Sequence, residues 1–205
     1  LRSQVAACAA GLRASGVGVG DRVAAYMPNM PESVIMMLAA TSIGAIWSSC
    51  SPDFGLQGVL DRFQQIEPKI LLAVDSYSYH GKLIDRSDTL LHIVEGLPTL
   101  RRAVIVNRKS IFAADSRFVD WNDFLQPTAE PLQFAQLDFD HPIYILYSSG
   151  TTGVPKCIVH GAGGTLLQHF KEHSFHCDLK PGDVLCYFTT CGWMMWNWLV
   201  GALFN

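Results

Sequence analysis

The chain has 205 residues, of which 49% are hydrophobic and 16% are charged, so it is too apolar for a disordered protein and long enough to bury a large core. Its length suits one domain or two. A formal net charge of −3 offers no basic surface to a phosphodiester backbone, which excludes nucleic acid from the expected partners.

The first segments alternate between helix-like and strand-like patterns. Arg2–Ser15 is rich in alanine and leucine and stops before Gly16, which is typical of a helix C-terminus. The glycine-rich turn that follows precedes the strand predicted over Arg22–Met27, whereas a dinucleotide-binding fingerprint follows its strand. Pro31 suits the first turn of the next helix, in which Val34–Ala40 is apolar on every side and therefore predicted to be buried.

The alternation continues along the first half of the chain. A short strand is predicted near Ala45–Ser49, an amphipathic helix over Leu56–Glu67 and a strand over Lys69–Val74. A helical stretch over Lys82–Glu95 then precedes a strand over Ala103–Asn107. Strands that alternate with helices predict an α/β fold with a mixed, largely parallel sheet that helices cover on both faces.

The second half of the chain is more irregular. Residues 108–140 are more polar, and we expect them to form an irregular connection. A strand over Pro142–Tyr147, a polar loop, a strand over Cys157–His160 and a helix over Gly163–His173 follow. Open α/β sheets bind ligands beyond the carboxyl ends of their strands, and the polar loop stands directly after such an end.

The polar loop, Tyr147–Lys156, has the composition of an anion-binding segment. Its glycines allow backbone N–H groups to approach an anion, its hydroxyls add donors, and its lysine adds the charge that a polyphosphate requires. It differs from the P-loop, because Cys157 stands where that motif has a hydroxyl for the metal ion. A polar hairpin turn is the alternative interpretation. The candidate phosphate-binding residues are Ser148, Ser149, Gly150, Thr151, Thr152, Gly153 and Lys156.

The ten residues of the polar loop resemble the Tyr-[Ser/Thr]-Ser-Gly-[Ser/Thr]-Thr-Gly-x-Pro-Lys signature of the adenylate-forming superfamily, which includes acyl-CoA synthetases, luciferases and peptide-synthetase adenylation domains. Gly16–Glu32 and Gly44–Gly55 are similar to earlier acyl-CoA synthetase blocks. Cys191–Trp198, here called the aromatic block, stands where the superfamily places a wall of its acyl pocket. Its Trp-Met-Met-Trp-Asn-Trp run most resembles the acetoacetyl-CoA synthetases.

The resemblance covers nearly the whole chain and implies part of a large N-terminal AMP-binding domain. The chain starts without an initiator methionine, so we expect it to be a fragment. The C-terminal domain, with its catalytic lysine, and the groups for adenine and ribose would lie beyond residue 205. We therefore expect no catalytic residue in this chain, and no activity from the chain alone.

The implied reaction is that of an acid–thiol ligase. A carboxylate attacks the α-phosphate of ATP, which binds with Mg²⁺, and gives an acyl-adenylate and diphosphate. The thiol of CoA, the co-substrate, then displaces AMP. We expect a short-chain keto acid, first of all acetoacetate, with acetate or another short acid as the alternative. The candidate acyl-pocket residues are Trp193, Met194, Met195, Trp196, Asn197 and Trp198, for which burial in the core is the alternative role.

The segment Asp75–Lys82 corresponds to a CoA-binding segment of acetyl-CoA synthetases. His80 and Lys82 are its basic residues and are the candidate CoA contacts. The segment lacks the arginines that those enzymes use there, so a solvated loop is the alternative role.

Three other interpretations remain. His169-Phe-Lys-Glu-His173 fits the His-x-x-Glu-His pattern of inverted zincins, although a polar helix flank explains it and we expect no metal site. The uncharged run Val184–Asn205 has the length of a membrane span, but polar residues interrupt it, and a strand followed by a pocket wall explains it without a membrane. The third is a truncated product without activity.

The cysteines indicate the compartment. The six cysteines include no Cys-x-x-Cys pair, which disfavours a structural zinc site and indicates free thiols. Free thiols persist in reducing compartments, so we expect a cytosolic protein.

Overall fold

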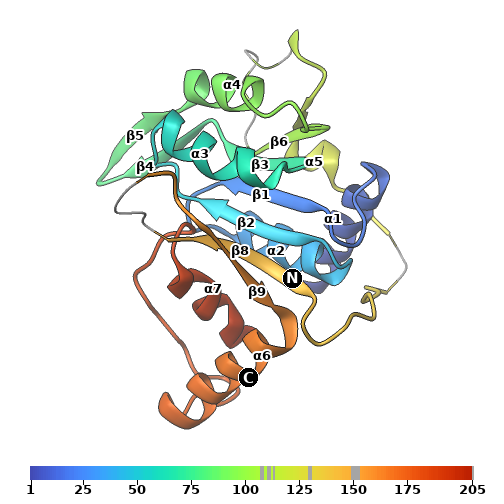
Figure 1. Ribbon diagram of the computed structural model, residues 1–205, viewed down its shortest axis with the longest axis vertical. Helices are drawn as coiled ribbons and strands as arrows, with labels where there is room; N and C mark the ends of the chain where they lie inside the picture. Colours follow the sequence, from blue (N-terminus) through green and yellow to red (C-terminus); the bar gives the residue numbers. More distant parts are fainter. Residues whose placement is uncertain (107–108, 110–111, 113, 129–130, 149–152, 205) are drawn as a thin grey trace.

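The computed structural model describes residues 1–106, 109, 112, 114–128, 131–148 and 153–204 (Figure 1). Within them, a seven-stranded sheet has the order β7-β6-β3-β1-β2-β8-β9. Its strands are β1 Arg22–Tyr26, β2 Ile46–Cys50, β3 Ile70–Val74, β6 Arg102–Val106, β7 Phe118–Asp120, β8 Pro142–Tyr147 and β9 Cys157–Gly161.

A hairpin and nine helical segments complete the described part of the chain. The hairpin consists of β4 Ser76–Tyr79 and β5 Lys82–Asp85. The α-helices are α1 Arg2–Ala14, α2 Pro31–Ser42, α3 Leu56–Ile66, α4 Ser87–Glu95, α5 Trp121–Phe124, α6 Ala162–Lys171 and α7 Met194–Gly201. A π-helix, η2 Glu172–His176, extends α6, and a 3₁₀ helix, η3 Ala202–Phe204, extends α7.

The sheet is parallel from β7 to β8, and β9 pairs antiparallel with β8. One core cluster joins α1 and α2 to the sheet, and a second joins α3 and α4 to its other face. Every residue of β2 and β3 is buried, because parallel strands are covered on both faces. This explains the continuous apolar character of β3, whereas β2 also buries Ser48 and Ser49. The predicted α/β fold, with a largely parallel sheet between helices, is confirmed.

Local sequence signals explain several helix boundaries. Pro31 stands in the first turn of α2 with Glu32, whose carboxylate suits the helix N-terminus. Helix α3 buries Val59, Phe63 and Ile66, which confirms its predicted apolar face.

No helix among the described residues is long and apolar enough to cross a membrane.

The helix predicted over Lys82–Glu95 is wrong in its first part, because Lys82–Asp85 is strand β5 and the helix starts at Ser87. His80 and Gly81 have φ values of 46° and 72°, and two such residues form the tight turn that closes a hairpin. Serine and tyrosine alternate over Ser76–Tyr79, as in a strand, whereas Lys82–Asp85 shows no alternation that separates it from the following helix.

Two other expectations need correction. Residues 108–140 are not wholly irregular, since β7 extends the sheet and the Asp120 side chain accepts from the Asn122 N–H at the start of α5 (2.8 Å). The strand expected after Val184 is absent, because residues 183–190 belong to no helix or strand of the described chain. A single extended segment needs a neighbouring strand for its backbone hydrogen bonds, and none of the described strands pairs with it.

Helix α1 meets α5 at Gly11, where a β-carbon would collide with the carbonyl oxygen of Phe124. We predict that Gly11→Ala lowers the free energy of unfolding by about 1–3 kcal/mol, because backbone cannot move aside as a flexible side chain can. Gly164→Ala in α6 is the control, since its β-carbon meets nothing within 4 Å; it should be neutral or stabilising by up to about 1 kcal/mol. Equal effects in urea unfolding would contradict this packing.

Candidate active site

The carboxyl ends of the central strands gather the segments that the sequence analysis selected. Along the strand order β3, β1, β2, β8, the hairpin follows β3, the aromatic block lies against the ends of β1 and β2, and the polar loop follows β8. Neighbouring strands are about 4.8 Å apart, so this edge spans about 15 Å. It lies on the left in Figure 1. One edge of the sheet therefore carries all three segments.

The ends of the polar loop are joined to each other. The Ser148 N–H donates to the carbonyl oxygen of Lys156 (3.0 Å). Gly153 has a φ of 144°, a conformation that favours glycine. Lys156 is exposed and forms no ion pair with the described residues. The predicted phosphate contacts Ser149, Gly150, Thr151 and Thr152 lie outside the described residues.

Helix α3 contacts both ends of the polar loop. At one end the Tyr147 hydroxyl donates to the carbonyl oxygen of Arg62 (3.3 Å), and the Arg62 guanidinium lies over the Tyr147 ring, 5.6 Å from its centroid. At the other end, Nε2 of Gln65 donates to the carbonyl oxygen of Pro155 (2.8 Å). Burial raises the pKa of Tyr147, so its phenol stays neutral and able to donate. Residues 62 and 65 are one helical turn apart, so one side of α3 supports the loop.

Hydrogen bonds hold the aromatic block against the ends of β1 and β2. The Ser49 hydroxyl donates to the carbonyl oxygen of Cys191 (2.6 Å), and the Cys191 thiol donates to the carbonyl oxygen of Pro28 (3.3 Å). Nε1 of Trp196 donates to Oδ1 of Asn29 (2.9 Å). The indole N–H thus has the partner that a buried tryptophan needs.

The predicted acyl-pocket residues divide between core and surface. Trp196 is fully buried, and its ring stacks on Trp47 with the centroids 6.3 Å apart. Asn197 is also buried, whereas Trp193 and Met194 are exposed. Trp196 therefore anchors α7 on the sheet, whereas the buried Asn197 amide has no hydrogen-bond partner among the described residues, and the exposed pair stands at the N-terminal end of the helix.

Two cavities border α6 and α7. A cavity of about 620 Å³ is lined by Met194, Met195 and Trp198 of α7. A larger and mainly apolar cavity of about 740 Å³ lies between α2 and the C-terminal helices, and Asn197 lines it. The first cavity also has a polar wall, which the sequence analysis did not assign to a pocket: His160, Thr165, Gln168, His169 and Glu172.

His169 lies in both cavities, although only 7% of the residue is exposed. Burial, and then the neighbouring His173 and His160, lower its pKa to about 4. Gly201 of α7 leaves room for this ring, since a β-carbon there would collide with Nδ1. His169 is therefore an uncharged polar group inside the protein at neutral pH.

The alternative zinc site at residues 169–173 is not assembled. His173 is fully buried, with its ring centroid 4.5 Å from that of Trp198. Glu172 forms an ion pair with Lys171 (3.0 Å). Within the described part of the chain, no group of three or more His, Cys, Asp or Glu residues is placed to hold a metal ion.

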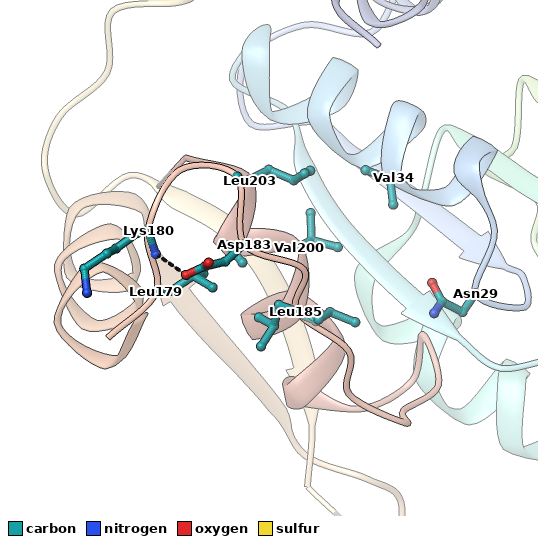
Figure 2. Close-up of a pocket in the computed structure, with 11 residues that line it drawn as sticks. Asn29, Val34, Leu179, Lys180, Asp183, Leu185, Val200 and Leu203 are labelled. Atoms are coloured by element: carbon teal, nitrogen blue, oxygen red, sulfur yellow. Dashed lines mark hydrogen bonds between the residues drawn. The ribbon is translucent and has the colours of Figure 1, made fainter. Parts of the chain in front are cut away.

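A third cavity, of about 310 Å³, lies where α7 meets the start of α2 and the loop after η2 (Figure 2). Its loop is a turn in which the Lys180 N–H donates to the Asp183 carboxylate (2.9 Å). The Lys180 side chain points away from the other labelled residues in Figure 2 and pairs with Asp178 (2.7 Å). This cavity therefore receives no ammonium group from Lys180 for an anionic ligand.

The predicted CoA contacts His80 and Lys82 are exposed at the turn of the hairpin. The base of the hairpin holds a network that the sequence analysis missed. Asp53, in the turn after β2, accepts from the Tyr77 hydroxyl (2.6 Å) and the Ser51 hydroxyl (2.7 Å). These two hydrogen bonds lower the pKa of Asp53, so its ionised carboxylate ties the hairpin to the turn after β2.

The neutral His169 predicts a pH dependence of stability. Its folded pKa, about 4, lies below the ordinary value of 6.5, so the unfolded chain binds more protons between these values. The free energy of unfolding should therefore fall as pH is lowered from about 6.5 towards 4. His169→Gln should reduce this slope in urea unfolding, and His92→Gln on the exposed side of α4 should not. A slope unchanged in the first variant would contradict the burial of a neutral imidazole.

Comparisons with known proteins agree with this arrangement. The chain is 55% identical over 206 residues to acetoacetyl-coenzyme A synthetase of Rhizobium meliloti and 43% identical over 213 residues to malonamoyl-CoA synthetase of Penicillium aethiopicum, and each alignment covers 99% of this chain. The chain superposes on acetoacetyl-CoA synthetase from Streptomyces lividans with a TM-score of 0.93. The two sequences are 48% identical, and the superposition covers 98% of this chain.

The chain spans about a third of the length of these relatives: 32%, 30% and 31%. The family model described as "AMP-binding enzyme" matches residues 1–205. The resemblance of the polar loop and the aromatic block to adenylate-forming enzymes is thereby confirmed, and the chain belongs to the AMP-binding enzyme family.

Proposed function

We propose that the protein carrying this chain is an ATP-dependent acid–CoA ligase, which converts acetoacetate, ATP and CoA to acetoacetyl-CoA, AMP and diphosphate through an acyl-adenylate. The observation that carries the proposal is the arrangement of the polar loop, the aromatic block and the hairpin on one sheet edge. It gives the phosphates, the acid and CoA neighbouring places, as two consecutive transfers to and from one adenylate require.

The polar loop suits the phosphates of ATP. Its ends are closed by the Ser148–Lys156 hydrogen bond, and Lys156 is an exposed cation without an ion-pair partner among the described residues. Transfer of a nucleotidyl group needs positioning and charge stabilisation, which such a loop provides to the departing diphosphate. Mg²⁺ prefers phosphate oxygens and hard protein oxygens, so it would bind mainly through the phosphates, with the Ser148 hydroxyl as a candidate protein ligand, and it would neutralise phosphate charge.

The acid would bind beside α7. Met194, Met195 and Trp198 give the cavity an apolar wall that excludes water, which protects an adenylate from hydrolysis. Trp193 would stand at the entrance, while Trp196 would hold the helix in place from the core. The acetoacetyl and malonamoyl groups in the relatives' names both carry a carbonyl at the third carbon. We therefore prefer a 3-oxo acid to acetate.

The hairpin would meet CoA. His80 and Lys82 are exposed at its turn, where cations suit the phosphates of CoA. The hairpin follows β3, two strands from β2, and Tyr77 at its base donates to Asp53 in the turn after β2. CoA bound at the hairpin would therefore reach an adenylate at the same edge of the sheet. All six cysteines are free thiols, which agrees with a cytosolic enzyme of small-molecule substrates.

The choice of acid is tested by ATP–diphosphate exchange with the full-length gene product. We predict that acetoacetate supports exchange about 10-fold or more better than acetate or butyrate, because an acid without the second carbonyl would leave the polar wall of the cavity without a partner. Malonamate is the close analogue. If acetate is the best substrate, the proposed 3-oxo acid is wrong but the ligase function stands. If no acid supports exchange, the ligase function is refuted.

The role of the lysine is tested in the same assay. Lys156→Ala should lower the exchange rate about 100-fold, since it removes a charge that acts on the departing diphosphate. Lys180→Ala is the matched control, because that lysine is exposed and paired with Asp178, and it should stay within about 2-fold of the natural enzyme. Similar losses in both variants would contradict a specific phosphate contact.

A further inference from the structure

An arginine of α3 lies against the first residue of the polar loop. The guanidinium of Arg62 is 5.6 Å from the ring centroid of Tyr147, the first residue of the loop. The opposite end of the loop is held one turn further along the same helix, where Gln65 donates to Pro155. The two described ends of the loop thus lie against the side of α3 that carries Arg62 and Gln65.

The guanidinium is oriented by two rings from neighbouring strand ends. It lies 4.6 Å from the ring centroid of Phe54, in the turn after β2, and over Tyr147, at the end of β8. Strands β2 and β8 are adjacent, so Arg62 is at the sheet edge where the loop begins. Its Nη1 donates to the Gly58 carbonyl oxygen (2.6 Å), and this is its one side-chain hydrogen bond to the described residues. The other N–H groups therefore remain available.

The charge of the expected ligand leaves room for a second cation. Diphosphate carries several negative charges, while Lys156 brings one positive charge to the loop and forms no ion pair among the described residues. A planar guanidinium binds two phosphate oxygens at once, which a lysine ammonium does not. Aromatic rings on its faces leave the edges of the guanidinium, where its donors lie, open to an anion.

We infer that Arg62 is a second phosphate contact, which binds the diphosphate from the α3 side while Lys156 binds it from the end of the polar loop. The inference rests on the proposed ligase function and adds a residue outside the loop motif to its phosphate site. Arg62 acts on the diphosphate of ATP, so its loss should affect the nucleotide and leave the acid unaffected.

Two substitutions separate charge from packing at this position. Arg62→Lys keeps the positive charge but loses the flat face that stacks on two rings, whereas Arg62→Met keeps an apolar contact and loses the charge. If Arg62 binds phosphate, Arg62→Met should lower kcat/KM for ATP about 10- to 100-fold, as expected for loss of a charge-assisted hydrogen bond. Arg62→Lys should lose less than Arg62→Met, because it keeps the charge although it gives up the contact to two oxygens at once. If Arg62 only packs, the order of the two variants should reverse.

The assay is ATP–diphosphate exchange by the full-length gene product, with KM measured for ATP, diphosphate and acetoacetate. The expected change is a rise in KM for ATP and diphosphate, with KM for acetoacetate unchanged within about 2-fold. Arg102→Met is the matched control, because Arg102 is exposed at the start of β6 and its Nη1 bonds only to the carbonyl oxygen of Arg101 among the described residues. It should leave every constant unchanged.

The outcomes distinguish the inference from the function on which it rests. Equal KM values for ATP in natural enzyme and Arg62→Met would overturn the phosphate contact while the ligase stands. A parallel rise in KM for acetoacetate would also overturn it, since it would indicate a general distortion. If the natural enzyme shows no ATP–diphosphate exchange with any of the acids, the ligase function itself is refuted. Thermal unfolding of both variants checks that loss of activity is not loss of the fold.

Discussion

The pairing of β8 with β2 determines the geometry of the candidate site. Trp47 of β2 pairs with Tyr144 of β8, and the Ser48 hydroxyl donates to the carbonyl oxygen of Ile145, 97 positions later in the sequence (2.9 Å). If β8 paired instead with the outer edge of β7, it would be five strand spacings from β2. The polar loop would then lie about 24 Å from the turn after β2. Its place beside β2 brings the loop to α3 and to the aromatic block.

One side of helix α3 packs in the core, and the adjacent side contacts the candidate site. Val59, Phe63 and Ile66 are buried against the sheet, which fixes the helix axis. Arg62 and Gln65 lie next to this apolar stripe and reach the two ends of the polar loop. The two ends of the loop are thus held in place by a packed helix before ligand arrives, so less of the binding energy is lost in ordering them.

Local signals were sufficient for much of the fold and for the place of the loop. Pro31 and the apolar run after it predicted α2, and the strand Pro142–Tyr147 ended where the structure ends it. The contacts between distant segments could not be predicted in this way. Nothing near Arg62 in the sequence indicates that Tyr147 will lie beside it, and the burial of Trp196 depends on Asn29 and Trp47, which are far from it in the chain. The hairpin at residues 76–85 was missed because its turn depends on positive φ at His80 as well as Gly81.

The most direct test of this account is a crystal structure of the full-length gene product with ATP, Mg²⁺ and a 3-oxo acid. We predict that the terminal phosphates lie between the polar loop and α3, within hydrogen-bond distance of Lys156 and Arg62, and that the acid lies beside Met194 and Met195. Phosphates bound away from this edge, for example in the cavity that Asn29 and Leu185 line, would contradict the account.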